Sequence, residues 1–154
     1  MNIRDILSEQ LIIPSIRAQD KEGVLQELAL HLQGCIDEDF RAADIKAALS
    51  AREQLGSTGV GEGVAIPHAK IAGLTNLTAC FARSSEGVAF DAIDEQPVRL
   101  IFVLLVPENS AGAHLKALAR ISRLLKNESF RTRLMGLPDA HALFEAFLEE
   151  DTGP

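Results

Sequence analysis

The residues best suited to chemistry lie in one loop and in the short apolar run that follows it. Glycine occupies positions 56, 59, 61 and 63, so four glycines fall within eight residues. Glycine accepts a positive φ and leaves backbone N–H groups open, so such a loop can hold an anion. Val64, Ala65 and Ile66 then lead through Pro67 to His68. Because histidine accepts groups reversibly near neutral pH, this pattern predicts phosphoryl chemistry on His68.

The surroundings of His68 should be stiff. Pro67 fixes its own φ and restricts Ile66, and we expect His68 at the end of a strand, where α/β sheets place ligands. A nucleophilic imidazole must be neutral, with its second nitrogen held as N–H by an acceptor such as a backbone carbonyl. The alternative, on the pattern alone, is a surface histidine in a turn.

Two further side chains have the chemistry to contact a phosphoryl group. Arg52 carries a planar guanidinium that binds two oxygens at once, although it can also complement the negative end of its helix. His114 is predicted in the first turn of a helix, where the helix dipole favours anions and a neutral imidazole. The alternative for His114 is a core histidine whose hydrogen bonds are satisfied.

The remaining polar residues of the loop are weaker candidates. Ser57, Thr58 and Gly59 are predicted to bind phosphate, although either hydroxyl can instead shape the turn. Lys70 is close in sequence but fits a solvated lysine equally well. Glu62 should point outward, because a carboxylate beside a phosphate would repel it.

Hydrophobic periodicity predicts the elements that must position these residues. Helices are expected over 21–33, with Asp20 as N-cap, and over about 40–53, where Ile45, Ala48 and Leu49 face inward and share that face with Arg52. Strands are expected over 76–83 and 98–106, a short strand and a turn over 87–96, and helices from 110, over 128–135 and over 139–149. Helices first, strands in the middle and helices last predict an α/β fold, with a mixed β-sheet sandwiched between helices.

The glycine loop and its histidine also carry a family resemblance. The segment STGVGEGVAIPHAK resembles the active-site signature of the type-2 IIA (mannitol/fructose-like) domains of the bacterial sugar phosphotransferase system. Three other segments are similar in the same order: Ala51-Arg52-Glu53, Leu100 to Pro107, and His114-Leu115-Lys116. The run LIFVLLVPENSAGAHLKALARISRLL resembles the nitrogen-regulatory branch, IIA-Ntr, most.

The resemblance implies a function and a set of partners. It implies that His68 accepts a phosphoryl group from an HPr-like phosphocarrier, with His114 and Arg52 beside it. In the regulatory branch the phosphorylation state would control target proteins such as potassium-transport or sensor-kinase proteins. A sugar-specific fructose- or mannitol-type IIA that passes phosphate to a IIB domain is the alternative. Neither role requires a cofactor or a metal ion.

Composition limits the other functions. One domain over residues 1–154, with its core at about 6–148, fits the length. A net charge of −7, with no Trp or Tyr, disfavours nucleic-acid binding. The GxxxxGK[ST] motif is absent, so no Walker-type nucleotide site is expected, and a metal hydrolase would lack a third ligand beside His68 and His114.

The expected compartment is the cytoplasm, without membrane insertion. Cys35 and Cys80 lack CxxC spacing, which disfavours a disulfide framework or a zinc site. The apolar run over 100–106 is far shorter than the ~20 residues of a membrane helix. His31 and His141 are expected to be surface or packing residues, and a non-catalytic interaction domain is disfavoured by the candidate site itself.

Overall fold

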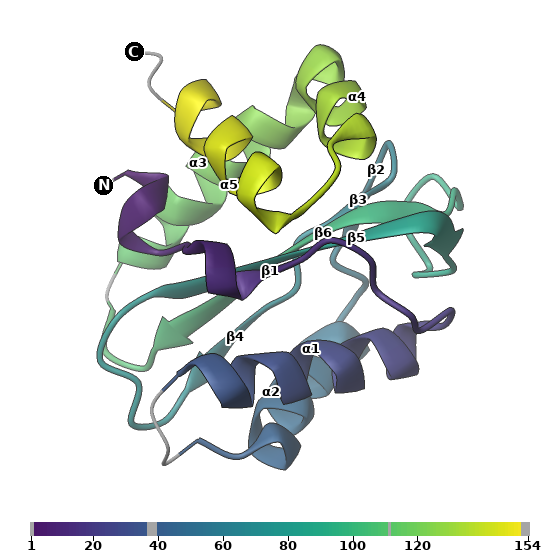
Figure 1. The fold of residues 1–154 in the computed structure, drawn as a ribbon. Helices are drawn as coiled ribbons and strands as arrows, with labels where there is room; N and C mark the ends of the chain where they lie inside the picture. Colours follow the sequence, from purple (N-terminus) through teal and green to yellow (C-terminus); the bar gives the residue numbers. More distant parts are fainter. Residues whose placement is uncertain (1, 37–39, 111, 152–154) are drawn as a thin grey trace.

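The described residues form a six-stranded mixed sheet with helices on both faces (Figure 1). The computed structural model describes residues 2–36, 40–110 and 112–151. Helices α1 (Lys21–Cys35) and α2 (Ala42–Gln54) cover one face of the sheet. Helices α3 (Ala113–Lys126), α4 (Glu128–Gly136) and α5 (Ala140–Glu150) cover the other face. This arrangement confirms the predicted fold class.

Strand β6 (Val98–Pro107) organises the sheet. Two short 3-10 helices, η1 (Ile3–Asp5) and η2 (Glu9–Leu11), lead into β1 (Ile12–Ile13), and the other strands are β2 (Gly59–Gly61), β3 (Val64–Ala65), β4 (His68–Ile71) and β5 (Thr78–Val88). The strand order is β1-β5-β6-β3-β2, and β4 also pairs with β6. On one side β6 runs antiparallel to β5, and on the other it runs parallel to both β3 and β4. The link between β3 and β4 therefore lies along one edge of β6.

The first two helices form largely as their sequence predicts. Asp20 caps α1, because its Oδ1 accepts a hydrogen bond of 2.7 Å from the N–H of Gly23. In α2 the buried face runs from Ile45 through Leu49 to Glu53, while Arg52 is only half-buried. Arg52, which was predicted to share this inward face, is thus half-buried at its margin, and Glu53 is the buried residue of the last turn. Among the described helices, none combines the length and the apolar character needed to cross a membrane.

The second half of the sheet differs from the prediction at one place. Residues 87–90 were expected to form a separate short strand, but β5 continues through Val88. Gly87 has a φ of 88°, and the register against β6 shifts between Arg83 and Val88. A bulge at a glycine thus lets one long strand bend where the sequence indicated an interruption. The turn at 91–96 follows it, as expected.

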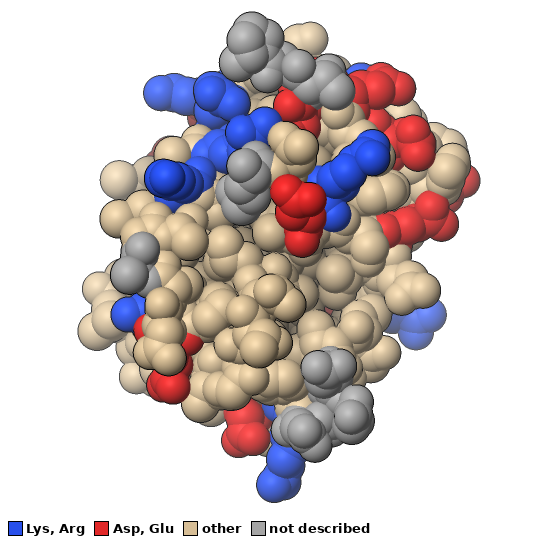
Figure 2. Space-filling model, turned by 90° about the vertical axis from the view of Figure 1, so that its left-hand side faces the viewer, with Lys and Arg blue, Asp and Glu red and all other residues tan. Residues whose placement is uncertain are grey.

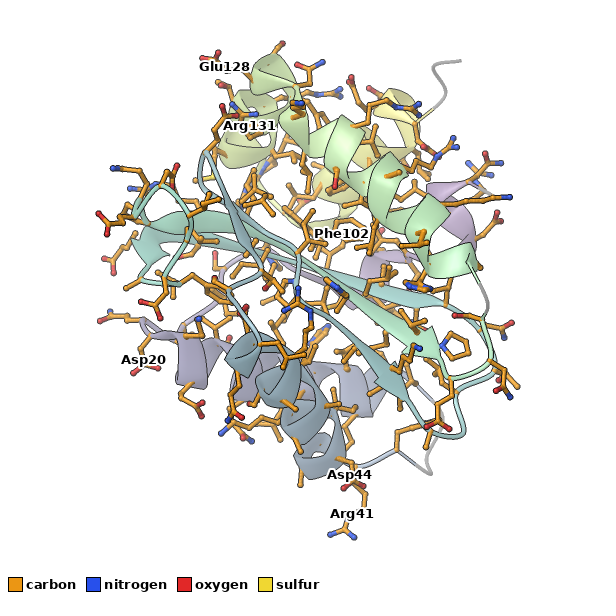
Figure 3. All side chains as sticks on the ribbon, turned by 180° about the vertical axis from the view of Figure 1, so that it is seen from behind. Asp20, Arg41, Asp44, Phe102, Glu128 and Arg131 are labelled. Carbon is orange, nitrogen blue, oxygen red and sulfur yellow. The ribbon has the colours of Figure 1, made fainter. Side chains whose placement is uncertain are left out.

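An aromatic cluster fixes α5 to the sheet. The ring of Phe147 in α5 lies 4.9 Å from that of Phe81 and 5.6 Å from that of Phe102, centroid to centroid. Phe130 of α4 completes the cluster at 5.3 Å from Phe147. These pairs are edge-on, the favourable geometry for aromatic rings. Figure 3 shows Phe102 between the sheet and the helices of this face, so both layers share it.

Candidate functional site

His68 is the first residue of β4 and is half-buried. It follows the two-residue link Ile66-Pro67 after β3, so it begins a strand instead of ending one as predicted. Its Nδ1 lies 2.8 Å from the carbonyl oxygen of Ile66. Because a carbonyl oxygen can only accept, Nδ1 carries the hydrogen and the lone pair remains on Nε2. This is the tautomer expected of a nucleophilic imidazole held by a backbone carbonyl.

The backbone that presents His68 is fixed on both sides. The N–H of Ile66 donates to the carbonyl oxygen of Thr58 over 3.0 Å, and the N–H of Leu104 donates to that of Pro67 over 2.9 Å. Ile66 and Pro67 are buried. The link is therefore bonded to the glycine loop and to β6 at once, which agrees with the predicted stiffness.

The glycine loop is a β-hairpin in the structure. Strands β2 and β3 pair antiparallel, and the turn between them uses positive φ at Glu62 (58°) and Gly63 (81°). Backbone N–H groups donate within the protein from Gly56 to the Glu53 carbonyl, from Gly59 to the Ser57 hydroxyl, and from Glu62 to Asp94. These three backbone donors are therefore already bonded within the protein, and an anion cradle built from the glycine loop stays a prediction.

The hydroxyl groups of the loop are also bonded within the protein. Ser57 donates to the carbonyl oxygen of Phe90 over 2.7 Å, and Thr58 donates to the carboxylate of Glu53. These bonds match the alternative in which both hydroxyls shape the turn. Phosphate binding by Ser57, Thr58 and Gly59 stays a prediction.

Arg52 lies in the last turn of α2, immediately before the glycine loop. Its Nη1 donates to the carbonyl oxygen of Gly56 over 2.8 Å, which satisfies a carbonyl just beyond the helix end. Helix α2 packs against β4, the strand that His68 begins. The guanidinium therefore lies at the end of a helix that packs against the strand of His68, and it has further N–H groups besides the one given to Gly56.

His114 is the second residue of α3, as predicted. Its Nδ1 is buried and has no hydrogen-bond partner within the described part of the chain. Leu118 and Ser122 follow at the i, i+4 spacing, so these three residues share one face of α3. Helix α3 lies on the opposite face of the sheet from α2, with the edge formed by β3 and β4 between them (Figures 1 and 3).

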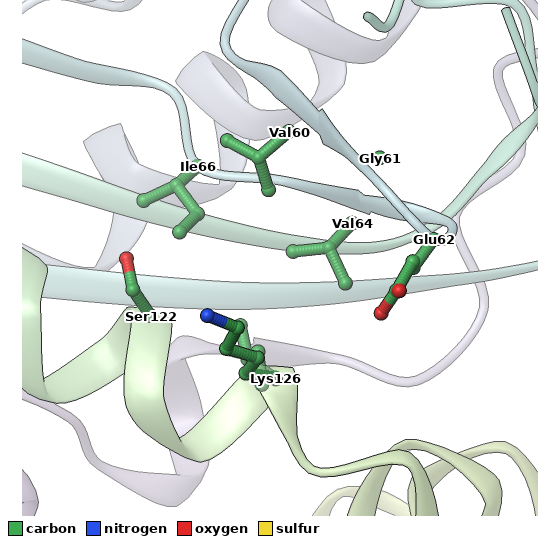
Figure 4. Close-up of a pocket in the computed structure, with 8 residues that line it drawn as sticks. Val60, Gly61, Glu62, Val64, Ile66, Ser122 and Lys126 are labelled. Atoms are coloured by element: carbon green, nitrogen blue, oxygen red, sulfur yellow. The ribbon is translucent and has the colours of Figure 1, made fainter. Parts of the chain in front are cut away.

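A cavity of about 310 Å³ separates this face of α3 from the hairpin (Figure 4). Its lining is mostly apolar and includes Val64 and Ile66 from the hairpin side, with Ser122 and Lys126 from α3. In Figure 4 the Lys126 side chain and Ser122 lie on the helix side of the cavity, and Ile66, Val60 and Val64 lie on the hairpin side.

The weaker candidates, and the two other histidines, have surroundings of their own. Glu62 is exposed, and its Oε2 is 3.1 Å from Nη2 of Arg131, which Figure 3 shows beside the hairpin tip. Lys70 is exposed on β4. His31 and His141 bond to the carbonyl oxygen of Gln10 and to the Glu9 carboxylate, respectively. These contacts agree with the surface or packing roles expected for both histidines.

Glu53 is a residue of this region that the sequence analysis did not single out. Its carboxylate is buried and accepts the backbone N–H of Thr58, at 2.9 Å from each oxygen, as well as the Thr58 hydroxyl. A signal was present in the spacing of Ile45, Leu49 and Glu53, which places an acidic side chain on a buried helix face. A buried carboxylate must be bonded, so this pattern indicates a structural partner nearby.

The described residues contain no group of three or more His, Cys, Asp or Glu side chains arranged to hold a metal ion. Cys35 and Cys80 are free thiols. Burial raises the pKa of the Cys80 thiol, and also that of Cys35, so neither sulfur is activated as a thiolate.

Comparison with known proteins defines the class to which this fold and site correspond, the IIA domains of the phosphotransferase system. The chain belongs to the family "Phosphoenolpyruvate-dependent sugar phosphotransferase system, EIIA 2", whose model matches residues 5–150. The predicted family membership is thereby confirmed.

Similar relatives come from both branches of this family. The chain is 40% identical over 144 residues to a nitrogen regulatory protein of Bradyrhizobium diazoefficiens, covering 94% of this chain and 93% of the relative. It superposes on the crystal structure of the nitrogen regulatory protein IIA-Ntr of Neisseria meningitidis with a TM-score of 0.87 and 39% identity, covering 94% and 98% of the two chains. It is also 36% identical over 151 residues to the fructose-specific EIIABC component of Bacillus subtilis, covering 98% of this chain but 24% of that longer protein.

Proposed function

We propose that this chain is a phosphocarrier of the nitrogen-regulatory type, which accepts a phosphoryl group on Nε2 of His68. The observation that carries the proposal is the 2.8 Å contact between Nδ1 of His68 and the Ile66 carbonyl oxygen. This contact leaves one ring nitrogen with a lone pair and holds the ring in one orientation. The donor is an HPr-like protein that carries a phosphoryl group on its own nitrogen.

The transfer is a displacement at phosphorus. The Nε2 lone pair of His68 forms a new N–P bond while the bond from phosphorus to the donor breaks, and the electron pair of that bond returns to the donor. Positive charge develops on the His68 ring as Nε2 gives up its lone pair. The Ile66 carbonyl accepts the Nδ1–H throughout and stabilises that charge.

His114 and Arg52 are assigned to the phosphoryl oxygens. The unpartnered Nδ1 of His114 is costly to bury, and a phosphoryl oxygen would give it a hydrogen-bond acceptor. Arg52 would use the guanidinium N–H groups that do not bond to Gly56. Because both groups act on charge that grows during transfer, they are expected to affect the rate more than the fold.

The surface around this region suits a protein partner. Four large apolar side chains of the hairpin region and α3 are exposed: Leu55 (85%), Val60 (57%), Ile93 (83%) and Leu115 (61%). The loop of Ile93 bonds to the hairpin through Gly59, and Leu115 follows His114. The side of the molecule at the N-terminal end of α3 has a broad uncharged area in its middle, bordered by mixed basic and acidic side chains (Figure 2). Large apolar side chains left exposed near a candidate site favour docking of another protein.

Phosphorylation would change which proteins bind this surface. A phosphoryl group adds about 1.5 to 2 negative charges, enough to reverse complementarity with an acidic partner. The similarity to nitrogen regulatory proteins supports a regulatory role, with potassium-transport or sensor-kinase proteins as the target classes. The two free cysteines suit the reducing cytoplasm in which we place this exchange.

A sugar-transport role is the second candidate. The similarity to the fructose-specific EIIABC component favours it, because there the phosphoryl group would pass to a IIB domain. Mixing the phosphorylated chain with a fructose-type IIB protein separates the two roles. Rapid loss of phosphate to IIB favours transport, whereas retention of phosphate favours regulation.

The decisive experiment is incubation with phosphoenolpyruvate, enzyme I and an HPr-type protein, followed by intact mass measurement. The expected result is one added phosphoryl group that is lost in acid, as an N–P bond would be, and its absence in His68→Ala. A modification that survives acid, or that persists in His68→Ala, would overturn the assignment.

A further inference from the structure

A continuous path of hydrogen bonds joins the end of α2 to the ring of His68. The Glu53 carboxylate accepts the N–H of Thr58, at 2.9 Å from each oxygen, and also its hydroxyl. The Thr58 carbonyl oxygen accepts the N–H of Ile66 over 3.0 Å. The Ile66 carbonyl oxygen accepts Nδ1–H of His68 over 2.8 Å. The Glu53 carboxylate is therefore linked to the His68 ring through Thr58 and then Ile66.

The Glu53 carboxylate is buried and fully paired, so it is linked to His68 through these bonds and not by direct contact. Its side chain is 5% exposed, and Nζ of Lys21 lies 3.6 Å from Oε2. Lys21 is itself positioned by Asp91 at 3.5 Å and by the face of the Phe90 ring at 5.0 Å. A buried carboxylate is tolerated when a cation and several donors satisfy it, and here Thr58 supplies the donors.

We propose that Glu53 is a positioning residue for the phosphoryl acceptor: through Thr58 and Ile66 it holds the carbonyl that keeps His68 in the Nδ1–H tautomer. Glu53 does not touch the reacting atoms. The bonds from both carboxylate oxygens fix the Thr58 backbone, and the Thr58 carbonyl in turn fixes the backbone of Ile66. Outer partners of this kind orient a functional imidazole and determine which nitrogen is free.

A purely structural role for Glu53 predicts something different. Glu53 also lies at the end of α2, so its loss could weaken the helix end and the loop without affecting the imidazole. The His68 ring distinguishes the two roles. Only in the positioning role does the choice of which His68 nitrogen carries the hydrogen depend on Glu53.

The test is ¹⁵N NMR of the histidine rings in the full chain, with Glu53→Gln compared to the wild type. Glutamine keeps the size of the side chain but replaces one acceptor oxygen by a donor, so Thr58 loses part of its support. In the wild type Nδ1 of His68 should be protonated and Nε2 unprotonated. In Glu53→Gln the two signals should move toward each other as the second tautomer is populated. Phosphoryl transfer should fall by about 10- to 100-fold, the range typical of groups that orient a metal-binding histidine.

Asp151→Asn is the matched control. Asp151 is also a buried carboxylate that accepts a backbone N–H, from Ile3 over 2.7 Å, and it pairs with Arg120. It lies on none of the bonds that lead to His68. This variant should lose stability, as Glu53→Gln does, but keep the His68 ring signals and the transfer rate of the wild type.

Thr58→Val is the second variant, in case Glu53→Gln does not fold. It removes only the hydroxyl bond to Glu53 and keeps the backbone bonds, so the His68 signals should move in the same direction by a smaller amount. Unchanged ring signals in folded Glu53→Gln, or in Thr58→Val if only that variant folds, would overturn the proposal. The transfer-rate effect rests on the proposed function. The ring signals do not, because they need no phosphoryl donor, so failure of the wild type to accept phosphate would count against the proposed function alone.

Discussion

Nδ1 of His68 lies 2.8 Å from the carbonyl oxygen of Ile66, and only Pro67 separates the two residues along the chain. The partner that sets the tautomer is thus supplied by the backbone immediately before the histidine. A backbone carbonyl cannot rotate away as a side chain can, and the proline restricts it further. In the proposed function, the nitrogen that would attack phosphorus is therefore prepared before a donor protein arrives, and other groups would act on the phosphoryl oxygens.

His114→Ala should slow phosphoryl transfer by on the order of 10²–10³ while the fold persists, because it removes one preorganised donor. Little hydrogen-bond energy is lost with the ring, since its Nδ1 has no partner within the described residues. Timed phosphorylation assays and circular dichroism would measure both effects. His31→Ala is the control, because His31 bonds to Gln10 and should not affect transfer. Transfer at the wild-type rate in His114→Ala would show that His114 only packs.

Arg52→Lys separates the phosphate clamp from the helix-end role. Lysine keeps the charge and can still donate to Gly56, but it cannot present two parallel N–H groups to a phosphoryl group. We therefore expect slower transfer with a nearly unchanged melting temperature. Stopped-time phosphorylation beside thermal melts would measure the two.

The control for Arg52→Lys is the same substitution at Arg41, an exposed residue at the other end of α2 that points away from the fold in Figure 3. Arg41→Lys should change neither the transfer rate nor the melting temperature. Equal transfer rates in Arg52→Lys and the wild type would remove Arg52 from the site.

Gly59→Ala should destabilise the protein by about 1–3 kcal/mol, the usual cost of overpacking. A Cβ at Gly59 would lie 2.8 Å from Cβ and 2.9 Å from Cα of Ala92, and the second of these is backbone that cannot rotate aside. Urea unfolding would measure the loss.

Gly34→Ala in α1 is the opposite case, because nothing lies within 4 Å of its added Cβ. That variant should be more stable than the wild type by roughly 0.5–1 kcal/mol, since alanine favours a helix. Equal stability of the two variants would contradict the close approach at Gly59.

The pair of His141 and Glu9 predicts a pH-dependent contribution to stability. The hydrogen bond and the charge of Glu9 raise the pKa of His141 above its ordinary value of 6.5. Because the pKa of His141 is higher in the folded than in the unfolded chain, its contribution to stability is fully present below the pKa of the unfolded chain. That contribution is lost as the pH rises through the pKa of the folded chain. Urea unfolding between about pH 5 and pH 8 should show a downward trend. Glu9→Gln should lower the His141 pKa in an NMR titration and flatten that trend, and an unchanged titration would refute the pairing.

The sequence alone determined the features that depend on neighbouring residues. Asp20 capped α1 because a cap needs only the next three residues, and the apolar stripe of that helix was buried as its period required. His68 was recognised because its loop, its apolar run and its proline are contiguous, and the family followed from the same segment. Each of these features depends only on residues that are close together along the chain, so the sequence is enough to predict it.

Only the tertiary structure decided which partners those residues meet. Ser57 bonds to Phe90, Glu62 to Asp94 and Arg131, and these partners come from the turn after β5 and from α4. The sequence did not show that some donors of the glycine loop are bonded within the protein, because it does not show which distant groups lie beside them. Glu53 was missed because a buried carboxylate is explained only by what surrounds it. The type of each side chain can be read from the sequence. The partners of a buried polar group are set by sheet pairing and layer packing, which bring together residues far apart along the chain.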